Sequence, residues 1–149
     1  MKKINNLKIG LLFIAFCLGL CSCSSSVPPK EKPVPSTASE WLETEDGFTA
    51  ELEAMAETFI EEYEGVEVRT KYGCEFTPID SYTKSTDDKV FKYGFIVSGQ
   101  YTDKSTNKIG DFVIKLFLKD GEFQKENRTY ACLYYRNELS GTAFNAIKQ

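Results

Sequence analysis

Thiols and carboxylates are the side chains of this chain that could do chemistry, because the sequence contains no histidine. Histidine is the usual general base near pH 7, and it completes the Ser-His-Asp and Cys-His nucleophile systems. It is also a common ligand of zinc. The lack of histidine excludes these arrangements, and the sequence gives no catalytic residue, no metal site and no cofactor.

Cys74 and Cys132 are the two thiols in the part of the chain that we expect to fold. Each occupies an alternating position of a predicted strand, where a small side chain suits a core. Export to an oxidising compartment would also allow a disulfide between them, worth about 4 kcal/mol in the chain-entropy model. The sequence leaves both interpretations open, but without histidine neither thiol is expected to act as a nucleophile.

Two carboxylate positions could serve as a general acid or base, Asp87-Asp88 and Asp111. Such a role needs a pKa raised by burial or by a like charge. Asp87 and Asp88 lie in a polar connector, residues 81–89, where solvent would keep both ionised. The oxygen-rich segment 103–107 is also expected to be a turn, because it lacks the spacing and closing Glu of an EF-hand loop.

Carboxylates are concentrated between Glu40 and Glu64, where ten occur without any Lys or Arg. The same segment carries an apolar stripe at helical spacing. Its members are Trp41, Phe48, Leu52, Met55, Phe59 and Tyr63. We expect Thr37 and Glu40 to form a capping box and Gly65 to end the helix, while Gly47 could divide it in two.

The acidic side of this helix has two interpretations, a solvated outer face or a docking face for a basic partner. With two tyrosines of a predicted strand it forms our candidate contact face. The residues of this face are Glu53, Glu57, Glu61, Glu64, Tyr134 and Tyr135.

Alternating apolar residues after the helix predict antiparallel strands. The segments are 66–76, 91–101, 112–118 and a returning strand from 123 to 135. Pro78 should end the first strand, Gly99 could mark a bulge, and Asp120-Gly121 is a strong signal for a two-residue hairpin.

The pattern predicts an α+β fold, with one N-terminal amphipathic helix packed on a curled antiparallel sheet of four to five strands. In this order of elements the domain resembles the cystatin-like and NTF2-like folds. The resemblance implies no functional residue, because such folds carry many unrelated functions.

The N-terminal residues have the pattern of a targeting signal. Residues 1–3 and Lys8 form a basic start, residues 9–20 are almost wholly apolar, and Ser22 precedes Cys23. The apolar run is shorter than the ~20 residues of a membrane-spanning helix, which favours a signal peptide. The segment resembles the signal peptide and lipobox of bacterial lipoproteins, in which the cysteine after the cleavage site is acylated.

The resemblance implies lipidation at Cys23 and divides the chain into three parts. These are a signal peptide (1–22), a lipidated tether rich in proline and serine (23–38) and a single α+β domain (39–149). Cys21 is a weaker candidate, because Leu20 would then precede the cleavage site, where the family uses Gly, Ala or Ser.

Charge narrows the choice of partner. Loss of Lys2, Lys3 and Lys8 with the signal peptide leaves 15 basic and 22 acidic residues in the mature chain, a net charge of −7. This excess of acid argues against nucleic acid or anionic lipid headgroups as the main partner.

We therefore predict a lipid-anchored, extracytoplasmic binding module of the bacterial envelope without catalytic activity. Its partners would be the membrane, through the N-terminal lipid, and an envelope protein or peptide. The membrane could be inner, outer or single. Two alternatives stay open: a carrier for a small hydrophobic ligand, and a cryptic NTF2-like enzyme that uses an Asp or a Tyr.

Overall fold

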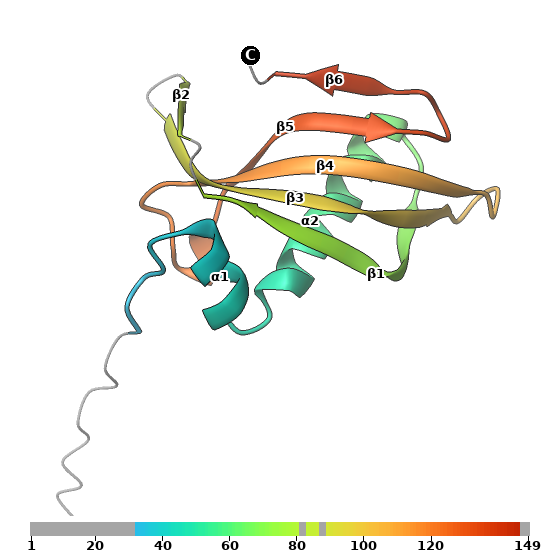
Figure 1. The fold of residues 1–149 in the computed structure, drawn as a ribbon. Helices are drawn as coiled ribbons and strands as arrows, with labels where there is room; N and C mark the ends of the chain where they lie inside the picture. Colours follow the sequence, from blue (N-terminus) through green and yellow to red (C-terminus); the bar gives the residue numbers. More distant parts are fainter. Residues whose placement is uncertain (1–31, 81–82, 87–88, 147–149) are drawn as a thin grey trace, which may run out of the picture. The chain divides into compact units, whose positions relative to one another are not determined.

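The computed structural model describes residues 32–80, 83–86 and 89–146, and its compact unit begins at Pro33. Two helices, α1 (Ala38–Thr44) and α2 (Phe48–Glu64), lie against one antiparallel sheet, so the fold is α+β as predicted. The strands are β1 (Val68–Ile79), β2 (Lys84–Thr86), β3 (Lys89–Asp103), β4 (Ile109–Lys119), β5 (Tyr130–Asn137) and β6 (Ala143–Asn145), with a 3-10 helix η1 (Lys125–Asn127) before β5. In Figure 1, α2 crosses one face of the sheet, and the described part of the chain places no helix over the other face.

The sheet has six strands in the order β1-β3-β4-β5-β6, with β2 paired to the beginning of β3. The prediction of four to five strands missed β2 and β6, because strands of three residues are too short to show a periodicity. Since β1 is an edge strand, Pro78 costs no ladder hydrogen bond, and it lies inside the strand instead of ending it.

Local signals set the limits of the helices. The Thr37 hydroxyl accepts a hydrogen bond from the Glu40 N–H (3.1 Å), which caps α1. The second half of the predicted capping box differs, since the Glu40 carboxylate accepts from the N–H of Ser36 (2.6 Å). Gly47 and Gly65 both adopt the left-handed conformation, with φ of 74° and 66°, and they separate α1 from α2 and end α2.

Helix α2 packs on the sheet through side chains spaced by four. These are Phe48, Leu52, Ala56 and Ile60. The predicted stripe differs, because Met55 and Phe59 are half-buried beside this row and Tyr63 is partly exposed. The sheet contributes aromatic rings to this contact: Phe48 contacts Phe95 of β3 with ring centroids 5.0 Å apart. Each large side chain buried here contributes roughly 1.5–3 kcal/mol.

The predicted two-residue hairpin at Asp120-Gly121 is wrong, although Gly121 does turn the chain with a φ of 84°. The returning strand begins at Tyr130 and not at 123, since Tyr130 pairs with Leu118. The Asp120 N–H donates to the carbonyl of Val90 (2.7 Å), which holds the end of β4 against β3. The loop between β4 and β5 packs against both helices.

That loop carries Arg128, whose side chain is 4% exposed. Its guanidinium pairs with Glu45 (Nη2–Oε1 2.6 Å) and Glu51 (Nη1–Oε2 2.7 Å). It also lies over the rings of Trp41 and Phe48, 4.9 and 5.5 Å from their centroids. These contacts explain why the segment before β5 cannot form a plain hairpin strand.

Within the described residues, no helix combines the length and the apolar character that crossing a membrane requires.

Candidate functional site

Cys74 and Cys132 are free thiols and do not form the disulfide that the sequence left open. They lie on β1 and β5, with β3 and β4 between them. Three strand spacings of ~4.8 Å exceed the ~7 Å that a disulfide can span between Cα atoms. The sulfurs are therefore too far apart in this sheet.

Burial raises the pKa of both thiols. The pKa of Cys74 rises to about 12, mainly through burial and also through the nearby carboxylates of Glu53 and Glu57. Burial raises the pKa of Cys132 to about 11, although hydrogen bonds with Tyr63 and the Tyr134 backbone oppose the shift. Both thiols stay protonated near pH 7, which makes them poor nucleophiles.

The candidate contact face does not form one free surface. Glu57 accepts a hydrogen bond from the N–H of Thr70 (2.6 Å), and the single hydroxyl hydrogen of Thr70 is shared between the carboxylates of Glu57 (2.9 Å) and Glu53. Glu61 accepts from the N–H of Val68 (3.0 Å). Because Val68 and Thr70 belong to the edge strand β1, Glu57 and Glu61 cover two of its N–H groups, and Glu53 bonds the side chain of Thr70 beside them.

The other half of this face is also divided. Tyr135 is fully buried and donates its hydroxyl hydrogen to Glu64 (2.7 Å). Glu64 further accepts from the hydroxyl of Ser140 (3.0 Å). Tyr134 points to the opposite side of β5, where the Lys115 ammonium lies 5.0 Å from its ring centroid. Of the six predicted contact residues, Tyr134 alone lies on the face of the sheet opposite α2.

Of the candidate carboxylates, the structure describes only Asp111. Asp87 and Asp88 are outside the described residues. Asp111 is exposed on β4 and accepts a hydrogen bond from the side-chain amide of Gln100 (2.8 Å). Among the residues that the structure describes, no three side chains of the metal-binding types come together.

Asp103 organises the turn predicted at 103–107. Its carboxylate accepts hydrogen bonds from the hydroxyls of Ser105 (2.6 Å) and Thr106 (2.7 Å) and from their N–H groups. These hydrogen bonds lower the pKa of Asp103 to about 2, against the opposing effect of burial. The predicted turn is present, and its carboxylate is occupied within the turn.

A β-bulge in β1 places Tyr72 on the surface. The pairing of β1 with β3 shifts between Lys71 and Cys74, so Tyr72 and Gly73 are extra residues. Tyr72 has a φ of 63°, and for a tyrosine this left-handed conformation costs roughly 1–2 kcal/mol. The residue is 88% exposed, so burial of its ring does not offset the strain. Bulges and unrelieved strain are enriched at functional sites.

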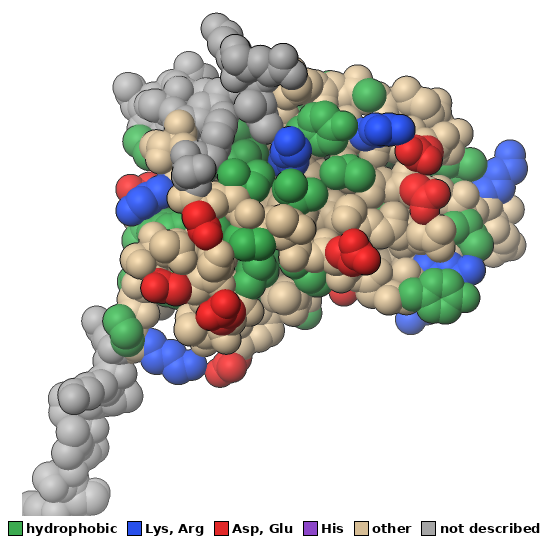
Figure 2. Space-filling view, viewed as in Figure 1, with side chains coloured by type: hydrophobic (Ala, Val, Ile, Leu, Met, Phe, Trp, Pro, Cys, Tyr) green, Lys and Arg blue, Asp and Glu red, His purple; other side chains and the backbone are tan. Residues whose placement is uncertain are grey.

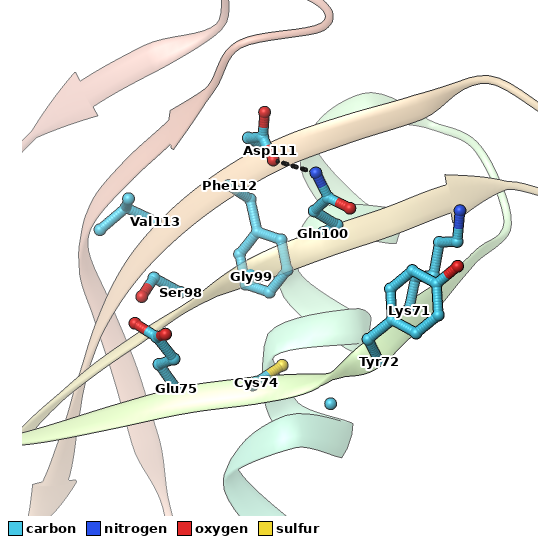
Figure 3. Close-up of a pocket in the computed structure, with 11 residues that line it drawn as sticks. Lys71, Tyr72, Cys74, Glu75, Ser98, Gly99, Gln100, Asp111, Phe112 and Val113 are labelled. Atoms are coloured by element: carbon cyan, nitrogen blue, oxygen red, sulfur yellow. Dashed lines mark hydrogen bonds between the residues drawn. The ribbon is translucent and has the colours of Figure 1, made fainter.

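Tyr72 borders a shallow, open groove of about 490 Å³ over β1, β3 and β4. Figure 3 shows Lys71 and Tyr72 at one side and the hydrogen-bonded pair Gln100–Asp111 beside them. The remaining side chains around the groove include Glu75, Ser98 and Val113. Its polar side chains alternate with core residues along each strand and so project away from α2.

Two glycines, Gly73 and Gly99, belong to the lining of the groove. A side chain at Gly99 would lie 3.3 Å from the carbonyl oxygen of Gly73 on the neighbouring strand, whereas a side chain at Gly73 would meet open space. Because Gly99 lies between Ser98 and Gln100, which project into the groove, a side chain at position 99 would point towards α2 and not into the groove. The Gly99 bulge predicted from the sequence was assigned to the wrong strand, since the extra residues lie opposite it in β1.

Acidic and basic side chains are interspersed on this face of the molecule and not separated by sign (Figure 2). The groove itself contains Lys71 together with Glu75 and Asp111. Recognition in the groove therefore depends on local hydrogen bonds and packing more than on a field of one sign.

No local sequence pattern marks this groove. Tyr72 was one of many strand tyrosines, and its signal was the glycine that follows it, since an isolated glycine in a strand pattern suggests a bulge. Gln100 and Asp111 become neighbours only through the pairing of β3 with β4.

Comparisons with protein-family models, with curated proteins and with solved structures found no match to this chain.

Proposed function

We propose that this chain is a lipid-anchored binding module on the extracytoplasmic side of a bacterial membrane, and that it holds another component of the envelope without changing it chemically. The observation that carries the proposal is Tyr72, an exposed aromatic residue held in a strained conformation at the border of a groove. The anchor is proposed from the sequence at Cys23, which lies outside the described residues.

The groove is preferred to the acidic helix as the contact site. The carboxylates of Glu53, Glu57 and Glu61 are occupied by the edge of β1, and binding a partner there would expose that edge. An envelope protein or peptide, the partner favoured by the sequence, would instead contact the groove, on the face of the sheet opposite α2.

The two alternatives have less support. A carrier of hydrophobic ligands needs space between helix and sheet, but Trp41, Phe48 and Phe95 are in ring contact there. An enzyme that uses a tyrosine needs an accessible hydroxyl of lowered pKa, whereas burial raises the pKa of both Tyr130 and Tyr135. The assignment to a cystatin-like or NTF2-like fold is a further proposal, supported by the order of one long helix before the antiparallel strands.

Site-specific photo-cross-linking in cells tests the proposed function. The cross-linking amino acid p-benzoylphenylalanine replaces Tyr72 in one variant and Ala54, an exposed residue of α2, in the control. We expect a discrete product from position 72, identified by mass spectrometry and by glycan staining, and no such product from position 54. Equal or absent cross-linking from both positions would contradict a binding role for the groove.

A further inference from the structure

We propose that the groove beside Tyr72 binds a neutral saccharide, such as a sugar unit of an envelope glycan; this inference rests on the proposed function. It specifies the chemistry of the ligand from the groups that surround the groove.

The groove is surrounded by both donors and acceptors of hydrogen bonds. A line of side chains across three paired strands contains the Lys71 ammonium, the Gln100 amide and the Asp111 carboxylate. The neighbouring line begins with Glu75 and Ser98. Donors and acceptors thus alternate over a short distance, which suits adjacent hydroxyl groups, since each hydroxyl both donates and accepts.

The Gln100–Asp111 pair fixes two of these groups in place. The Gln100 amide nitrogen donates to one Asp111 oxygen at 2.8 Å. This bond orients the carboxylate and leaves its second oxygen for a ligand. The amide oxygen of Gln100 is a further acceptor in the same position. Two fixed acceptors side by side can receive two neighbouring sugar hydroxyls.

The ring of Tyr72 adds an exposed aromatic surface beside these polar groups. The apolar C–H face of a sugar ring packs on an aromatic ring, and Tyr72 offers an exposed ring at the border of the groove. The Lys71 ammonium, 4.7 Å from the ring centroid, contacts this ring, while most of the residue stays open to solvent. The bulge that strains Tyr72 also projects it from the sheet.

The size of the groove and the charges around it also suit a neutral saccharide. The volume of the groove, about 490 Å³, falls within the roughly 300–1,000 Å³ of small-ligand sites. Because the groove holds one ammonium and two carboxylates, it favours neither a strongly cationic nor a strongly anionic ligand. An extended peptide is a weaker match, since β1 offers no free edge in the groove, where it pairs with β3.

Isothermal titration calorimetry on the full-length lipoprotein in detergent tests this inference. The probes are maltotetraose and chitotetraose as neutral saccharides, with tri-arginine and tri-glutamate as charged peptides of similar size. We expect at least one saccharide to bind and neither peptide to do so.

Variants then locate the site. Tyr72→Ala should weaken saccharide binding by roughly 3- to 10-fold, and Tyr72→Phe should retain it, because stacking needs the ring and not the hydroxyl. Tyr72→Gly relieves the left-handed strain, so it should fold at least as well as the parent protein and still lose binding. Asp111→Ala should weaken binding as well, whereas Thr58→Ala on α2 should not.

The outcomes separate the two proposals. Saccharide binding that is unchanged by Tyr72→Gly and Asp111→Ala would overturn the assignment to this groove. Binding of a peptide but of neither saccharide, together with a protein cross-linked at position 72, would overturn the saccharide inference and leave the proposed function intact. If neither saccharide binds and position 72 gives no product, both proposals are wrong.

Discussion

Arg128 connects the turn between the two helices with the loop before β5. Its guanidinium carries two short ion pairs and lies over two aromatic rings while remaining almost inaccessible to water. Burial lowers the pKa of Arg128, but the hydrogen bonds and charges of Glu45 and Glu51 outweigh it, so the net shift is upward. Tyr130 adds a hydrogen bond to Glu51 at 2.7 Å. Removing the cation would leave the largely buried carboxylates of Glu45 and Glu51 without their counter-ion.

We therefore expect Arg128→Ala to lower the free energy of unfolding by about 3–5 kcal/mol, the usual cost of breaking a buried pair by removing one partner. Arg128→Lys should cost less, because it keeps the charge but loses the planar fork and the stacking. Urea denaturation measures both changes. The matched control is Arg136→Ala, whose pair with Glu138 is more than half exposed and should be worth about 0–1 kcal/mol. An Arg128→Ala effect no larger than the control would contradict this role.

Asp103 gives the protein a defined response to acid. Its folded pKa of about 2 lies below the ~3.9 of an unfolded chain. A carboxylate with a depressed pKa stabilises the fold above its unfolded pKa, and this contribution is lost as the pH falls through the folded pKa. The window for Asp103 therefore runs from about pH 4 down to about pH 2.

The corresponding prediction is that Asp103→Asn flattens the fall in unfolding free energy between about pH 4 and pH 2. Denaturant titrations at a series of pH values would measure it. Ser105→Ala, which removes the hydroxyl with the largest effect on this pKa, should flatten the same window in part. An unchanged slope in both variants would show that the turn does not hold the pKa of Asp103 down.

At the scale of elements, the sequence was informative wherever a signal is local. The caps at Thr37, Gly47 and Gly65 follow from neighbouring residues. The apolar face of α2 was predicted only in part, since Phe48 and Leu52 belong to it, while Ala56 and Ile60 were not expected there. The start of β5 could not be predicted, because the segment before it is determined by Arg128 and its partners on the distant helices. The groove likewise arises from the pairing of three strands, which no local pattern contains.

The relation between α2 and β1 shows how a charge pattern can mislead. A row of glutamates at spacing four is usually a solvated face, and here it also covers the edge of a sheet. Glu57 and Glu61 accept hydrogen bonds from N–H groups of Thr70 and Val68 that have no strand partner. Uncovered strand edges promote association between chains.

We expect the double variant Glu57→Ala with Glu61→Ala to lose stability and to self-associate. Each lost hydrogen bond to a carboxylate should cost about 1–3 kcal/mol. Amide hydrogen exchange should increase at Val68 and Thr70, and light scattering should detect larger species. Glu62→Ala, an exposed residue of the same helix, is the control and should change neither measurement. A monomeric double variant with protected amides would mean that the edge is covered by other contacts.

For the molecule as a whole, the proposed function needs both an anchor and a binding domain. A lipid on Cys23 would tether the domain by about 14 residues rich in proline, which reach on the order of 40 Å at ~3.1 Å per residue. Such a tether lets a weak groove work, because confinement to one surface raises the effective concentration of a partner on the same surface. The proposed anchor would thus contribute to binding as well as to location.

The last prediction concerns the proposed lipid anchor at Cys23. Cys23→Ala should move the protein from the membrane fraction to the soluble or secreted fraction, because acyl chains contribute roughly 0.8 kcal/mol for each buried CH₂ and two or more chains give a stable attachment. Cell fractionation followed by immunoblotting measures the distribution. Cys21→Ala is the matched control, since it alters the neighbouring cysteine and should leave the protein in the membrane. If Cys23→Ala stays in the membrane while Cys21→Ala is released, lipidation occurs at Cys21; if both variants stay, the apolar segment itself anchors the chain.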